Sequence, residues 1–326
     1  TQLVKKMRYN RDWNKVSSLE IFLHGIIMGS INKLPGISGG LYSLIIGFYS
    51  HLMQSIKSLN LKNFKILRYN GGKKFMKKIN GNFLLFISFG MIMSYFSTSK
   101  ILDYFLIKNE LYVWSVFFGL IIGSLYILIK RIEKTDIKTI LYLVFGLLFG
   151  IFISLSEPLY ENRNLLFVFF CGFISICGIT IPGLSGSFLL ILLGNYKLLL
   201  VDSVNNFYNL ISNLFYSSDE KLIVENELIN ILMIFFVGSV IGLIILSKFL
   251  TFLTKNYPNQ LDHLIIGFVL GTLSIVWPWN QIKNNIDLIE ISSGTNSFAI
   301  VLILIGLILT VIINNYVDEK NIRTNR

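Results

Sequence analysis

Charged residues are scarce in this chain of 326 amino acids. Only 14% of the residues are charged, whereas 53% are hydrophobic and the mean hydropathy is +0.65. A soluble domain of this length would have too little polar surface to cover itself. The composition therefore excludes a soluble globular protein and indicates one that lies in a lipid bilayer.

Signatures of enzymes and metal sites are also scarce. The sequence contains no Walker phosphate loop and no His-Glu-x-x-His motif, and its three histidines are scattered. Its apolar stretches contain no paired carboxylates for acid–base catalysis. Cys171 and Cys177, the two cysteines, are six residues apart in one apolar arm, which fits neither a metal site nor a disulfide framework. We therefore expect no enzymatic activity, no cofactor and no bound metal.

The sequence instead contains long apolar runs. A helix needs about 20 apolar residues to cross about 30 Å of hydrocarbon. Six runs come near this length, and each predicts one crossing: 83–99, 111–129, 139–155, 229–253, 262–279 and 297–316.

A duplicated motif lies at the centres of two further apolar stretches. LPGISGG begins at Leu34 and IPGLSGS begins at Ile181, and the offset between them is 147 residues. At this offset, nine of 28 positions are identical between residues 22–49 and 169–196. At an offset of 148 the similarity continues, because residues 119–125 match residues 267–273. The chain therefore consists largely of two copies of one unit.

Both motif regions are broken at their middle into arms of about 15 residues, which are too short for ordinary crossings. We therefore predict re-entrant hairpins over 20–56 and 165–198. With this arrangement one face collects 22 of the 29 Lys and Arg residues, and the opposite face has 6 basic and 11 acidic residues. The positive-inside rule makes the first face cytoplasmic. An odd number of crossings in each copy then turns the second copy upside down.

The predicted fold class is thus an all-α integral membrane protein with two inverted repeats, each a re-entrant helical hairpin plus three transmembrane helices. The protein is expected to be multi-pass in the bacterial cytoplasmic (inner) membrane, with both termini cytoplasmic. Basic loops beside lipid headgroups account for the net charge of +11 without a nucleic-acid partner. The predicted segments are a basic cytoplasmic lead-in at 1–17, a first repeat at 18–155, a second repeat at 162–316 and a cytoplasmic tail at 317–326.

The Pro-Gly motifs favour an anion site. Proline fits the first turn of a helix, and the glycines permit a tight reversal that leaves backbone N–H groups free for an anion. Ser38 and Ser185 either contact the ligand or cap their helices. Lys33 is the one basic residue placed deep in the membrane region, and it either pairs with the anion or extends to the cytoplasmic headgroups. Asn32, Thr180, Tyr49 and Tyr196 are weaker candidates.

The segments GSINKLPGISGGLYSLIIGFY, GFISICGITIPGLSGSFLLILLGNY and IIGFVLGTLSIVWPW resemble the bacterial polyprenyl-phosphate transporter family over about residues 18–316. The resemblance implies a flippase-like carrier that returns undecaprenyl phosphate from the outer to the cytoplasmic leaflet for cell-envelope synthesis. Many family members have Asp at Asn32, Glu at Ser50 and Arg at Ser274, so the resemblance does not carry proton coupling through those carboxylates. With Lys33, the expected substrate-binding residues are the motif positions Pro35, Gly36, Ser38, Gly39, Pro182, Gly183, Ser185 and Gly186.

A small-anion channel or exchanger is the alternative function. Such a protein would also use helix N-termini and turns rich in Gly, Ser and Pro, and only a lateral opening for a prenyl tail would exclude it. The expected partners are a polyprenyl phosphate and membrane lipids. The sequence does not predict the oligomeric state.

Overall fold

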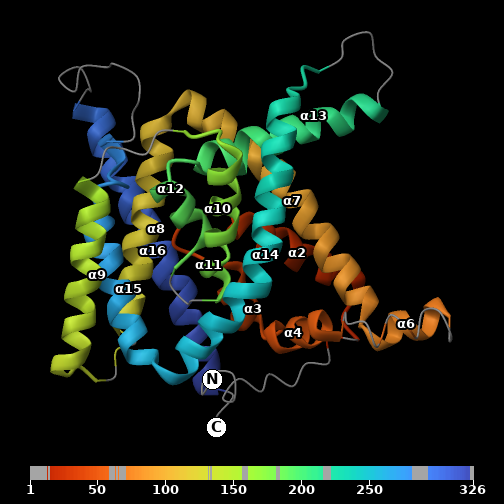
Figure 1. Cartoon of the computed structure of the whole chain (residues 1–326), viewed down its shortest axis with the longest axis horizontal. Coiled ribbons are helices and arrows are strands. Elements are labelled where there is room, and N and C mark those ends of the chain that lie inside the picture. The colour runs from red at the N-terminus through yellow and green to blue at the C-terminus, as the bar shows by residue number, and fades with distance from the viewer. Residues whose placement is uncertain are drawn as a thin grey trace. The chain divides into compact units, whose positions relative to one another are not determined.

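A computed structural model describes residues 13, 15–58, 63, 65, 71–130, 132, 134–155, 161–180, 184–215, 222–280 and 293–323. Within these residues every regular element is a helix (Figure 1). The chain divides into two compact units. The first comprises Thr1–Ile31, Gly39–Ser97 and Asn315–Arg326, and the second comprises Asn32–Ser38 and Thr98–Asn314. Most of the predicted lead-in and the end of the tail, residues 1–12 and 324–326, lie outside the described residues.

Five helices are long and apolar enough to cross a membrane. They correspond in length and apolarity to five of the six predicted crossings, and they confirm the prediction of an all-helical membrane protein. They are α7 (Gly81–Lys108), α8 (Glu110–Lys130), α9 (Ile137–Leu155), the Asn226–Leu246 part of α14 (Asn226–Asn256) and the Thr295–Asn314 part of α16 (Ser293–Arg323).

The apolar run 262–279, which predicts one crossing, is not one continuous helix. The helix in this region, α15 (Pro258–Thr272), has 15 residues. It begins with a proline in its first turn, where the missing N–H is no disadvantage. It ends at Thr272, whose hydroxyl donates back to the carbonyls of Phe268 and Val269. A turn and the short 3₁₀ helix η2 (Pro278–Asn280) follow, because Pro278 cannot continue a helical ladder.

In the first unit, α2 (Ser18–Ile31) packs on α7 through glycine. A Cβ at Gly25 would collide with the backbone of Ile87, and one at Gly90 would collide with the carbonyl of Phe22. Two short helices, α3 (Gly39–Ile46) and α4 (Tyr49–Ser58), follow the motif, and α6 (Gly72–Lys78) precedes α7. The core of this unit is a cluster that includes Trp13, Phe48 and Phe83.

The second unit repeats this packing with the equivalent residues of the second copy. Here α10 (Leu165–Ser175) packs on α14, since a Cβ at Gly172 would meet the carbonyl of Phe235 and one at Gly238 would meet that of Phe169. The duplication seen in the sequence therefore extends to contacts between helices. The elements that follow α10 are α11 (Cys177–Thr180), α12 (Gly186–Leu192), the π-helix η1 (Leu198–Asp202) and α13 (Ser203–Phe215).

The helix after each motif ends in the same way. Gly47 has φ 92° and Gly194 has φ 70°, in the left-handed region that favours glycine. The next amide reaches back to the residue five positions earlier, from Phe48 to Ser43 and from Asn195 to Leu190. This is the 6→1 bond of a Schellman motif. It explains why glycine occurs at position 47 and again 147 residues later.

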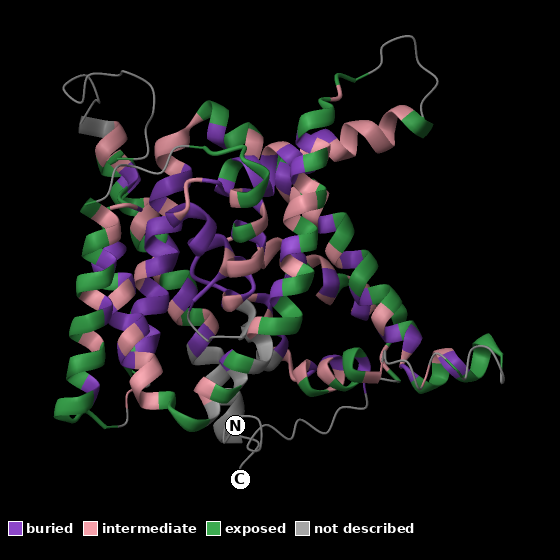
Figure 2. Cartoon of the chain, in the orientation of Figure 1, coloured by how far each residue is buried: buried purple, intermediate pink, exposed green. Residues whose placement is uncertain are grey.

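Within the second unit, the second long helix of each copy packs on the third long helix of the other. A Cβ at Gly119 of α8 would collide with the carbonyl of Ile303 on α16. A Cβ at Gly267 of α15 would collide with the carbonyl of Leu143 on α9, and α9 and α15 run side by side (Figure 1). Figure 2 shows α8 mostly buried, whereas α9 carries a broad exposed face.

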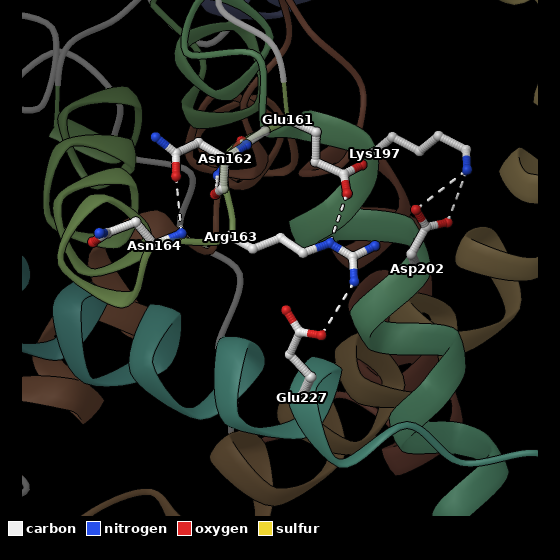
Figure 3. A network of polar contacts seen from close by, with 8 residues as sticks. Glu161, Asn162, Arg163, Asn164, Lys197, Asp202 and Glu227 are labelled. Carbon is white, nitrogen blue, oxygen red and sulfur yellow. Dashed lines mark hydrogen bonds and ion pairs between the residues drawn. The ribbon is translucent and has the colours of Figure 1, made fainter.

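In the second unit, polar contacts join acid-rich segments that the sequence assigns to the face opposite the cytoplasmic one. Arg163 pairs with Glu161 at 3.1 Å and with Glu227 at 3.4 Å (Figure 3). Asn205 donates to Asp103 at 3.2 Å. The basic loop before α9 instead contacts the start of α15, where Thr135 Oγ1 lies 3.5 Å from His263 Nε2.

Candidate functional site: the loop between α2 and α3

The first Pro-Gly motif forms the loop 32–38 between α2 and α3. Gly36 adopts φ 87°, a conformation that strains any residue with a side chain. A Cβ at this position would also lie 2.6 Å from the carbonyl oxygen of Leu120 on α8. Glycine is therefore required at position 36 both for the turn and for the close approach of the loop to α8. Pro35 and Ile37 on either side are buried.

Lys33 is fully buried within the protein, with 0% exposure. Its Nζ donates to the carbonyl of Leu200 in η1 at 2.6 Å, and its own carbonyl accepts from the Tyr196 hydroxyl at 2.9 Å. The side chain thus contacts neither water nor lipid in this structure, so it does not extend to the headgroups. Ser99 also donates to Leu200 O, at 2.9 Å. An irregular turn such as η1 presents carbonyls to side-chain donors, and π-helical turns often occur at functional sites.

Ser185 caps a helix and also contacts the first motif. Its Oγ caps α12 by accepting from the amide of Phe188 at 3.2 Å. The same oxygen accepts from the amide of Gly36 at 2.9 Å, which joins the second motif to the first. Ser187 adds a parallel link, since its hydroxyl donates to the carbonyl of Leu34 at 3.0 Å. The two motifs therefore meet at the Ser185 hydroxyl.

The remaining predicted residues are placed less directly at this junction. Pro182 and Gly183 lie outside the described residues. Gly39 is buried at the start of α3, and Ser38 before it is half-buried. Gly186 faces the carbonyl of Ser175, with which a Cβ would collide. Gly186 therefore serves the packing of α12 on α10 within the second hairpin.

Sequence reasoning missed or undervalued four residues that hold the loop. Tyr196, only a weaker candidate from the sequence, is buried, donates to Lys33 O and packs against Trp114 and Phe117. Ser99 had a signal, because the pair Ser99-Lys100 recurs 148 residues later. The sequence gives no indication of a role for Ser187 or Leu200. The first copy has glycine at the position of Ser187, and Leu200 contributes only its backbone carbonyl.

The groups that converge at the junction are one ammonium, one backbone N–H and several hydroxyls, which are hydrogen-bond donors suited to an anion. Residues 36–40 also match the Gly-x-Ser-x-Gly pattern of hydrolase nucleophiles. That motif depends on a turn from a strand into a helix. Here the residues connect two helices, so the pattern lacks the setting that activates the serine.

Comparison with known proteins identifies the family of this chain. A curated polyprenyl-phosphate transporter of Vibrio cholerae is 32% identical over 81% of this chain and 79% of its own length. A polyprenyl-phosphate transporter of Staphylococcus aureus is 26% identical over 78% of this chain and 85% of its own length. No solved structure matches the chain significantly. Residues 28–297 match the family model described as VCA0040-like, undecaprenyl phosphate translocase-like. The matched region includes the loop 32–38 and both motifs, and the chain belongs to this family of undecaprenyl phosphate translocase-like proteins.

Proposed function

We propose that this protein is a transporter that moves a polyprenyl phosphate, undecaprenyl phosphate in particular, from the outer to the inner leaflet of the bacterial cytoplasmic membrane. Membership of the translocase-like family and two relatives named polyprenyl-phosphate transporter support this function. Five apolar helices of membrane-crossing length provide the setting for a lipid substrate. The relatives are named as transporters, and we propose no enzymatic step.

The observation that carries the headgroup site is the bonding of the first motif to the second. Lys33 Nζ and the Gly36 amide are both buried donors, held by Leu200 O and Ser185 Oγ. A phosphate monoester presents three strong acceptor oxygens. We place the headgroup where its phosphate oxygens accept from Lys33 Nζ and the Gly36 amide in place of Leu200 O and Ser185 Oγ. Binding would then replace two hydrogen bonds within the protein by two hydrogen bonds to the ligand. Pro35, Gly39, Pro182, Gly183 and Gly186 shape the turns, and Ser38 and Ser185 supply hydroxyls.

Two inverted repeats would suit this exchange. The reciprocal packing of α8 on α16 and of α15 on α9 is what a two-fold relation between the copies requires. Each copy also has a helical hairpin with a broken centre, and non-helical backbone at membrane depth is tolerated where it is enclosed by protein or lines a wet cavity. We propose that both hairpins are re-entrant and enter from opposite faces, with the termini cytoplasmic. Alternating access would then expose the junction to each leaflet in turn.

The direct test is leaflet-resolved lipid exchange. The purified full-length chain is reconstituted in liposomes that contain a fluorescent polyprenyl phosphate, and a membrane-impermeant quencher reports the outer-leaflet fraction. We expect faster exchange of the polyprenyl phosphate than in empty liposomes, and no acceleration for a neutral polyprenol of equal length. The alternative, a small-anion channel or exchanger, would instead release trapped chloride or inorganic phosphate without accelerating lipid exchange.

A further inference from the structure

The first hairpin carries a titratable cluster that the headgroup site does not use. His24 lies in the middle of α2, within the apolar sequence 18–31, and is half-buried. Its Nδ1 is 2.7 Å from the hydroxyl of Tyr42 on α3. Its Nε2 is 3.7 Å from the carboxylate of Glu20, one helical turn earlier. Both ring nitrogens therefore face a group that can exchange or stabilise a proton.

The other surroundings of His24 are aromatic. The ring of Trp13 stands edge-on at 5.7 Å and that of Phe48 lies at 5.8 Å. From α7, Phe83 packs on Phe48, and His51 of α4 packs on the ring of Phe83 at 4.6 Å. Among the contacts described for His24, Glu20 and Tyr42 are the ionisable partners of the imidazole, while His51 packs on Phe83, which in turn packs on Phe48. An ionisable residue inside a membrane region is a functional site by default, because its charged form is costly there.

The second copy of the hairpin has no equivalent of this cluster. At the offset of 147 residues, the positions of Glu20, His24 and Tyr42 correspond to Phe167, Cys171 and Leu189. The second hairpin is therefore built at these positions from residues that do not form such a network. The fold of the hairpin does not require a carboxylate, an imidazole and a phenol, so their presence in the first copy calls for a role other than packing.

We infer that His24 is a proton-binding site that couples a proton gradient to the transport of the lipid phosphate. This inference rests on the proposed function. Histidine is the side chain whose ordinary pKa, about 6.5, allows a charge change near neutral pH. A proton taken from water joins the unprotonated ring nitrogen. In the resulting imidazolium, Nε2–H faces the Glu20 carboxylate and Nδ1–H donates to Tyr42 Oη, so the tyrosine hydrogen turns to another acceptor. Release of the proton to water restores the neutral ring.

The cluster is connected to the headgroup loop through the chain. His24 is on the helix that ends at Ile31, directly before the loop 32–38, and Tyr42 is on the helix that begins directly after it. The contact between them therefore joins the two arms that hold the loop. A coupled proton also has a physical purpose, because moving an anionic headgroup toward the negative interior opposes the membrane potential.

Steady-state distribution of the lipid tests the coupling. The reconstituted full-length protein is given a pH gradient of about one unit, with the membrane potential held at zero by potassium and valinomycin. One proton carried per lipid then shifts the leaflet ratio of the fluorescent polyprenyl phosphate up to about tenfold toward the alkaline side, whichever way the protein is inserted. We expect this shift for the wild type and for His263→Gln, a control for a buried histidine of α15. For His24→Gln we expect a ratio near that at equal pH, with exchange at equal pH retained.

A titration provides a readout besides transport. In protein with ¹³C-labelled histidine, the signal lost in His24→Gln identifies His24, and its shift is followed from about pH 5 to 9. We expect His24 to titrate, and Glu20→Gln to lower the midpoint because the carboxylate favours the imidazolium. A gradient response that persists in His24→Gln, or a His24 signal that does not titrate, would overturn the inference. If the wild type exchanges no lipid at all, the proposed function fails, and the titration still decides the proton site.

Discussion

The amide of Gly36 donates to the hydroxyl of Ser185 across 149 residues of chain, at 2.9 Å. Each partner belongs to one copy of the duplicated Pro-Gly motif. The same hydroxyl caps α12, so the start of this helix and the loop 32–38 depend on one oxygen atom. This contact gives the serine of the second motif a double role, and it leads to the first prediction.

Ser185→Ala should destabilise the protein by about 2–4 kcal/mol. The cap of α12 contributes about 1 kcal/mol, and the buried Gly36 N–H left without a partner costs about 1–3 kcal/mol. The measurement is denaturant unfolding in detergent micelles. Ser187→Ala is the matched control, because it removes the bond to Leu34 O, worth about 1 kcal/mol, and the 3.3 Å contact with Ser185 Oγ, but leaves the cap and the Gly36 bond in place. Equal losses for the two variants would contradict the double role of Ser185.

Gly36→Ala should be clearly more destabilising than Gly71→Ala. Both glycines have positive φ, 87° and 84°, so both substitutions strain the backbone by about 1–3 kcal/mol. Only at Gly36 would the new methyl group collide with the backbone of Leu120, whereas nothing lies within 4 Å of a Cβ at Gly71. We expect the difference in unfolding free energy to be about 1–3 kcal/mol. Similar melting temperatures for the two variants would show that the loop can move away from α8.

Lys33→Ala should weaken binding of a short-chain polyprenyl phosphate about tenfold to a hundredfold, since a charged hydrogen bond contributes about 1.5–3 kcal/mol. Lys33→Arg should retain part of the affinity. The variant should remain folded, because Ser99 still donates to Leu200 O after the ammonium is removed. Binding to purified protein is measured by calorimetry, with a melting curve as the check on folding. Unchanged affinity in a folded Lys33→Ala protein would exclude Lys33 from the headgroup site.

Single cysteines should reveal two opposite faces. In a background without Cys171 and Cys177, cysteines at Lys74 and Lys134 should be protected from an impermeant thiol reagent in intact cells, whereas cysteines at Glu161 and Glu225 should react. All four positions are exposed, so protection reports the membrane side rather than burial. Permeabilised cells, in which all four must react, are the control. Labelling of positions 74 and 225 from the same side would rule out the inverted arrangement.

Composition and apolar run length determined that this is an all-helical membrane protein, because the hydrophobic requirement of a bilayer leaves a signal in every crossing helix. Self-comparison of the sequence also located the duplication, and the equivalent glycines at 47 and 194 share a positive φ. These features depend on residues close together in the chain. The end of α15 at Thr272 could not be predicted from the sequence, because the apolar residues continue past the point where the helix ends.

Only the tertiary structure decided what the motif residues contact. Sequence reasoning left Ser185 either as a cap or as a ligand contact, and the structure shows one oxygen that caps α12 and bonds the first motif. It left Lys33 either beside an anion or among the headgroups, whereas its ammonium bonds a backbone carbonyl of Leu200. A carbonyl acceptor is common to every residue type, and the partners are 149 and 167 residues apart. The residue types at these positions therefore do not predict these hydrogen bonds, which form only when the helices pack.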